Sequence, residues 1–315
     1  FLKRGDPNQK QGEATQGFLQ VLMRGSKNEE AWQVPAPKDW RTSYRRRSLA
    51  NWMTDTEHGA GHLLARVMAN RLWQHHMGRG IVNTPNDFGL QGELPTHPQL
   101  LDWLASELIE GGWRLKPLHK KIVMSATYLQ SSGYNAAKMK ADPLNKLHWR
   151  RTPSRLQAEV IRDSLLKMSG LLDTKMYGAG TLDERMKRRS IYFMIKRSRL
   201  IPTMQLFDSP EPLVSQGSRP ATIIAPQALH FMNNAQVREA AVALAKQLEK
   251  QSDNAAVVTL GYQTVLGRAP TGKEQQSISD FIGAQEKSYP NNGRQIALAD
   301  FAQVLFGLNE FIYVD

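Results

Sequence analysis

Four charged side chains recur at helical spacing between residues 153 and 169: Arg155, Glu159, Arg162 and Asp163. Side chains three or four residues apart are neighbours on a helix, so we expect these four to share one face and form one ion-paired cluster. A solvated ion-pair face is the first interpretation. In the second, Glu159 or Asp163 is the general acid or base of an enzyme. The catalytic residues, if the chain has any, are unknown from the sequence, and these two carboxylates are weak candidates.

A second group of polar residues lies in a predicted helix over residues 61–77. Asn70, Arg71 and His75 fall within or beside the apolar arc of this helix when it is projected at about 100° per residue. A polar group on a buried face costs about 1–3 kcal/mol unless it has a partner. We therefore expect the three side chains to be buried and hydrogen-bonded, with partners such as Asp87 in the glycine-rich loop 78–95. A structural network and a ligand site explain the pattern equally well. Arg155 and Arg162 are likewise candidates for a ligand site or a polar network.

The positive charge of the chain is concentrated in its middle. The formal net charge is +12, and residues 138–199 hold 16 basic and 6 acidic residues, a net of +10. Such a surface attracts polyanions. The candidate polyanion-binding residues are Arg185, Lys187, Arg188, Arg189, Lys196, Arg197 and Arg199. An acidic partner, such as upstream domains of the same protein, or an anionic polysaccharide would fit them, and a basic face that only aids solubility is the alternative. Nucleic acid is disfavoured because aromatic residues do not alternate with the cations and no DNA-reading motif is present.

The cysteine and histidine content restricts metal and redox chemistry. There is no cysteine, which excludes disulfides, cysteine-ligated zinc, iron–sulfur clusters, thiol catalysis and a CxxCH haem attachment within this chain. His58 and His62 have the spacing of an HxxxH pair, but Gly59 and Gly61 lie between them and the order is not that of an HExxH zinc motif. His75 and His76 are adjacent and would point about 100° apart on a helix, so neither pair predicts a zinc site. We expect no metal and no cofactor in this chain. No run of about 18 apolar residues is present, so no membrane span is expected.

The elements that must position these residues are mostly helices. The pattern predicts a mainly α, multi-helix globular fold with a minor β element, a buried strand over residues 190–196. Three regions are expected: an irregular N-terminal segment 1–60, a helical core 61–199 with the basic segment and the strand, and a helical region 200–315 that is separate from the core or continuous with it. The expected helices cover 61–77, 97–110, 117–128, 153–169, 225–250, 253–266, 272–287 and 294–308. Thr96 with Gln99 and Thr271 with Glu274 have the spacing of capping boxes.

Several long motifs, taken together, resemble a known family. They are Ala69–Val82, Pro85–Gly89, Pro95–Ala105, Ser125–Ser132, Arg155–Glu159 and Asn309–Asp315. In this order along nearly the whole chain, they resemble the planctomycete-type PSD-one family, a domain of unknown function (fifteen-fifty-three). Members of that family typically form the C-terminal part of large exported proteins, after a cytochrome-c-like segment and a second uncharacterised domain. No activity is established for it, so the resemblance implies no catalytic residues.

The resemblance implies a setting more than a reaction. It implies an extracytoplasmic location, periplasmic or cell-surface, and a haem carried on a region upstream of Phe1, which is itself not a start methionine. We therefore expect a C-terminal module of an exported, haem-associated multidomain protein, with a binding or assembly role toward an anionic partner. The alternative is an enzyme that acts on an anionic polysaccharide with Glu159 or Asp163 as acid or base.

Overall fold

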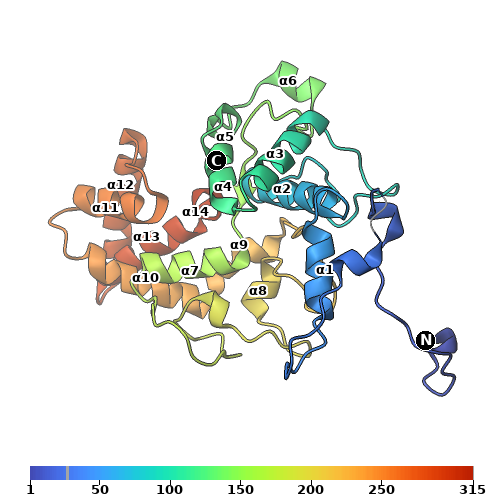
Figure 1. Ribbon diagram of the computed structural model, residues 1–315. Coiled ribbons are helices and arrows are strands. Elements are labelled where there is room, and N and C mark those ends of the chain that lie inside the picture. The colour runs from blue at the N-terminus through green and yellow to red at the C-terminus, as the bar shows by residue number, and fades with distance from the viewer. Residues whose placement is uncertain (26–27, 315) are drawn as a thin grey trace. The chain divides into compact units, whose positions relative to one another are not determined.

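A computed structural model describes residues 1–25 and 28–314, and the chain divides into two compact units (Figure 1). Unit 1 spans Phe1–Arg151 and unit 2 spans Thr152–Asp315. Both are mainly helical, as the sequence predicts. The division falls inside the segment 61–199 that was expected to form one helical core. It also cuts the basic segment 138–199, so the candidate cations at 185–199 all belong to unit 2.

Unit 1 is built around three helices, α2 (Gly61–Met77), α3 (Pro98–Glu110) and α4 (Leu115–Val123). The bounds of α2 match the prediction, because Gly78 ends it in the left-handed region at φ 82°. Small residues on α2 let the helices approach closely: Ala65 and Ala69 are fully buried. The core between the helices contains Leu72, Trp73, Ile81, Leu101, Leu104, Leu108, Leu118 and Ile122. The expected long loop 78–95 contains no helix or strand.

The rest of unit 1 consists of short elements. The helix expected over 117–128 is interrupted, because Ser125 caps a separate helix α5 (Ala126–Leu129) by accepting the backbone N–H of Tyr128. The helix α6 (Ala136–Ala141) follows. The segment expected to be irregular contains α1 (Arg45–Thr54) and the 3-10 turns η1 (Lys3–Gly5), η2 (Gln20–Leu22) and η3 (Glu29–Trp32). A small apolar cluster holds this segment together and comprises Phe18, Trp32, Trp52 and Ala60.

Unit 2 is organised around one buried helix, α13 (Gly293–Gly307). Its side chains are buried on several sides, and α10 (Ala235–Leu248), α11 (Asn254–Leu266) and α12 (Gly272–Ser288) pack around it (Figure 1). Close approach of α11 requires Gly261, because a Cβ atom there would lie 2.8 Å from the ring of Phe301. The remaining helices are α7 (Ala158–Met168), α8 (Pro202–Leu206), α9 (Ala225–Asn233) and α14 (Asn309–Ile312).

Capping explains where two of these helices begin. The helix expected over 225–250 is two helices, because Asn234 accepts the N–H groups of Gln236 and Val237 and so starts α10. The capping box of Thr271 with Glu274 is confirmed. The box expected at Thr96 is wrong. That hydroxyl donates instead to the carbonyl of Ile81, and α3 begins at Pro98 without a side-chain cap.

The β structure lies elsewhere than expected. Within residues 1–25 and 28–314, the only sheet pairs β1 (Ser154–Arg155) with β2 (Tyr313–Val314) in antiparallel register. Segment 190–196 is not a buried strand: Ser190–Tyr192 form a 3-10 turn (η4), and Ile191 and Ile195 are exposed. The bonds that Thr181 makes with Tyr192 and Met194 give only an isolated bridge. The segment contains β-forming residues, but no strand among the described residues pairs with it.

Candidate functional site

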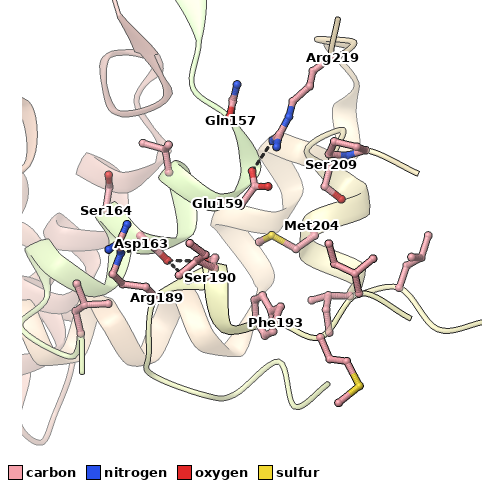
Figure 2. Close-up of a pocket in the computed structure, with 18 of the residues that line it drawn as sticks. Gln157, Glu159, Asp163, Ser164, Arg189, Ser190, Phe193, Met204, Ser209 and Arg219 are labelled. Atoms are coloured by element: carbon pink, nitrogen blue, oxygen red, sulfur yellow. Dashed lines mark hydrogen bonds and ion pairs between the residues drawn. The ribbon is translucent and has the colours of Figure 1, made fainter. Parts of the chain in front are cut away.

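Unit 2 contains a pocket of about 750 Å³ beside α7 (Figure 2). One face of α7 forms a wall, with Val160, Asp163, Ser164, Lys167 and Met168 at helical spacing. The opposite wall comes from η4, residues 193–201 and α8, and residues 209–210 and 219 complete the rim. Most of the lining is apolar, with a few charged groups at the edge. Ligand sites in proteins typically combine these features.

Glu159 is held at one end of the pocket by an arginine far away in the sequence. Arg219 donates to the Glu159 carboxylate at 2.7 Å, and both side chains are about one third exposed (Figure 2). This charge-assisted bond is short and neutralises the carboxylate. The carboxylate of Glu159 therefore lines the pocket as one half of an ion pair with Arg219.

Asp163 is held by the turn η4 that faces α7. Its Oδ1 accepts both the backbone N–H and the hydroxyl of Ser190 at 2.7 Å (Figure 2). The guanidinium groups of Arg162 and Arg189 lie 3.7 and 3.9 Å from its two oxygens. Asp163 thus joins α7 to η4 while it also lines the pocket.

The buried side chain of Arg162 also joins α7 to the segment 186–190. Its side chain is only 5% exposed and donates to the backbone carbonyls of Met186 and Arg188 and to the hydroxyl of Ser190. Its guanidinium also stacks on Phe193 at 4.6 Å. Burial lowers the pKa of Arg162, and the nearby carboxylates of Asp163 and Glu184 oppose that shift. The side chain organises the segment 186–193 that forms the far wall.

Arg155 lies outside the expected cluster. It belongs to β1, because α7 begins only at Ala158, and its guanidinium bonds Asp208 at 2.7 Å and the carbonyls of Phe207 and Thr222. Burial alone would raise the pKa of Asp208, but the N–H and hydroxyl of Thr222 and the Arg155 guanidinium together lower it. The expectation of one cluster is therefore wrong: among the described residues Arg155 pairs with Asp208, and Glu159 pairs with Arg219.

The polar residues of α2 divide between the core and the surface. Asn70 is fully buried, and its amide accepts the N–H of Val82 at 2.8 Å and donates to its carbonyl at 2.9 Å, as expected. Arg71 and His75 are exposed, which corrects their expected burial. The buried face of α2 runs through Ala65, Ala69, Leu72, Trp73 and Met77, so both side chains point away from it. Asp87 accepts the N–H of Gly89 and shapes the turn of the loop.

The seven candidate cations differ in their exposure to solvent and in whether another group already binds them. Lys187 pairs with Glu239 at 2.6 Å, and Arg188 donates to the carbonyls of Lys175, Tyr177 and Ala179 while stacking on Tyr192. The other five are exposed: Arg185, Arg189, Lys196, Arg197 and Arg199. Within the part of the chain that the structure describes, no carboxylate pairs with any of these five except Asp163 with Arg189.

Unit 1 contains two histidine pairs that the sequence did not indicate. The rings of His76 and His119 share a hydrogen bond of 2.7 Å, and the ring of His148 lies 5.7 Å from that of His97. Burial first, and then the charge of the neighbouring histidine, lowers the pKa of His76 and of His148. No group of three or more metal-ligating side chains gathers within residues 1–25 and 28–314. Over the same residues, no helix has both the length and the apolar character to cross a bilayer.

Sequence reasoning missed several residues that line the pocket. Ser164 and Lys167 share the α7 face with Asp163, so extending the helical projection by one turn would have found them. Arg219, Met194 and Ile195 carry no such signal, because each reaches the pocket only through tertiary structure.

Comparison with known proteins identifies the chain by family. Neither the curated proteins nor the solved structures include a significant match to it. One family model matches residues 45–282, which is most of the chain and includes parts of both units. The chain therefore belongs to the PSD1 family, whose description is "Protein of unknown function (DUF1553)".

Proposed function

We propose that the chain is a binding or assembly module that holds an anionic partner through the exposed cations of residues 185–199. The observation that carries the proposal is the state of Lys196, Arg197 and Arg199. All three are exposed in one turn, which the bond from the Arg199 N–H to the Lys196 carbonyl closes, and no carboxylate among the described residues pairs with them. Unpaired cations held close together attract a polyanion and release its counterions on binding.

Retention on heparin and on alginate across a salt series tests this proposal. We expect a triple variant, Lys196→Ser, Arg197→Ser and Arg199→Ser, to elute at clearly lower salt than the wild type. Arg188 stays unchanged because its guanidinium bonds three backbone carbonyls. The matched control removes the same charge from exposed residues 45–47, all arginine. Equal elution of wild type and triple variant, or an equal loss in the control, would contradict the proposal.

The proposed setting is that of an exported, haem-associated multidomain protein outside the cytoplasm. Its support is the sequence resemblance, and the haem would be carried by another region, since this chain contains no cysteine. Fractionation of the source cells, with immunodetection of the native protein and haem staining of the same band, tests both parts. A band in the cytoplasmic fraction, or one without haem, would contradict the corresponding part.

An enzyme acting on an anionic polysaccharide is the second proposal, and one observation favours it. Glu159 and Asp163, four residues apart, both line the 750 Å³ pocket. Release of reducing ends from alginate or another uronate polymer would support catalysis, provided that Glu159→Gln or Asp163→Asn abolishes it. Absence of release by the wild type would leave only the binding role.

A further inference from the structure

The pocket of unit 2 has a polar end and an apolar end. Ser164 and Lys167, three positions apart on α7, both line the pocket. The Arg189 guanidinium lies 3.9 Å from the carboxylate of Asp163, which is next to Ser164 in the chain (Figure 2). No hydrogen bond or ion pair from another described residue occupies the Ser164 hydroxyl or the Lys167 ammonium. This end therefore offers a hydroxyl donor, the unpaired ammonium of Lys167, and the guanidinium of Arg189, which lies 3.9 Å from Asp163.

Away from Ser164, the pocket is lined by large apolar side chains beside the Glu159–Arg219 ion pair (Figure 2). They are Phe193, Met194, Ile195, Leu200, Ile201 and Met204. Ile195 is 82% exposed and Met194 is 48% exposed, although both are apolar. Exposed apolar groups at the rim of a concave site mark a surface that a ligand covers.

The charges around the pocket set the sign of the ligand. Glu159 is paired with Arg219, and Asp163 already accepts two hydrogen bonds from Ser190. Three cations and two carboxylates line the pocket, and Lys167 has no counterion among the described residues. An anionic head group would therefore meet a complementary charge, whereas a cationic one would not.

We infer that this pocket binds a free single-chain anionic amphiphile, with a carboxylate-type head group at Ser164, Lys167 and Arg189 and an apolar chain along residues 193–204. The volume of about 750 Å³ falls in the range of roughly 300–1,000 Å³ of small-molecule sites. Burial of the chain supplies affinity in proportion to the apolar area covered, and the head group supplies orientation. The inference goes beyond the proposed polyanion binding, because Lys196, Arg197 and Arg199 do not line this pocket.

Isothermal titration of the 315-residue chain with sodium dodecanoate, below its micelle concentration, tests the inference. We expect saturable binding by the wild type, at least about tenfold weaker binding after Lys167→Glu and after Ile195→Asp, and tighter binding of dodecanoate than of octanoate. The matched controls are Ile223→Asp, at an apolar residue that is also 82% exposed but outside the pocket, and Lys246→Glu, an exposed lysine of the same unit. Both should bind within about twofold of the wild type.

Three outcomes would overturn the inference. They are absence of saturable binding, equal losses in the pocket variants and their controls, and equally tight binding of dodecyltrimethylammonium, which has the same chain but the opposite charge. The triple variant at 196, 197 and 199 separates this inference from the proposed function. It should retain dodecanoate binding even where it loses heparin, so either proposal can fail alone.

Discussion

The buried side-chain amide of Asn70 anchors the loop 78–95 through its two hydrogen bonds to Val82. Removing this amide gives the sharpest stability prediction. Asn70→Ala deletes both bonds to Val82, whose backbone N–H and carbonyl then remain buried without a partner. Each unsatisfied group costs about 1–3 kcal/mol, so unit 1 should lose about 2–6 kcal/mol. This is a large part of the 5–15 kcal/mol that a domain typically has. We expect Arg71→Ala, the exposed neighbour, to cost less than about 1 kcal/mol.

Urea unfolding followed by tryptophan fluorescence measures this loss selectively. All seven tryptophans lie in residues 1–151, so the emission reports unit 1. Asn70→Ala should lower the transition midpoint strongly at an unchanged slope, and Arg71→Ala should leave it nearly in place. Similar midpoints for the two variants would refute the reasoning. They would mean that Val82 finds other partners once the amide is gone.

Three further predictions concern buried charges and titrating groups. Arg162→Met should destabilise unit 2 by about 2–6 kcal/mol, because it leaves the two carbonyls of Met186 and Arg188 without their donor, at about 1–3 kcal/mol each. Hydrogen exchange of residues 186–193 should accelerate, and unchanged exchange there would contradict the structural role. The pKa of His148 is lowered in the folded chain, so below pH 6.5 the unfolded chain binds more protons and the fluorescence-detected unfolding midpoint should fall on acidification. His148→Asn, which suits the φ of 53° at this position, should reduce that fall. An equal fall in both proteins would argue against this role of His148. The lowered pKa of Asp208 contributes stability above pH 3.8, and this stability is lost as the pH falls further. Asp208→Asn should therefore have a lower melting temperature than the wild type at pH 7, measured by circular dichroism. The difference in melting temperature should close in acid, and a difference that persists would contradict the prediction.

Local signals in the sequence were sufficient for most helices. The period of α2 with Gly78 after it, and the capping box at Thr271, depend on residues within a few positions of one another. The burial of Arg71 was mispredicted for a physical reason. Four apolar residues, 63, 64, 67 and 68, suggested one face, but the small residues Ala65 and Ala69 form the actual contact. Helix packing favours close approach as much as hydrophobicity.

The candidate site could be predicted only in part. The carboxylates of Glu159 and Asp163 were found from spacing on one helix, but the partner of Glu159 is 60 positions away and the partner of Asp163 is 27 positions away. No periodicity joins such residues, because the tertiary fold brings them together. The exposed Ile195 is a related case, since its sequence neighbours predicted a strand core and only the structure shows its side chain at a pocket rim.

The pairing of β1 with β2 has a consequence for the covalent connectivity of unit 2. Ser154 lies opposite Val314, and the N–H of Leu156 bonds the carbonyl of Ile312, so residues 154–156 and 312–314, near the two ends of the unit, are neighbours in space. A short linker could therefore join the two ends, and new ends could be opened in the exposed turn at residues 290–291. The order of the helices along the chain would then change while their packing around α13 stayed the same. Evolution and protein engineering can thus insert this unit into another chain through a single point on its surface.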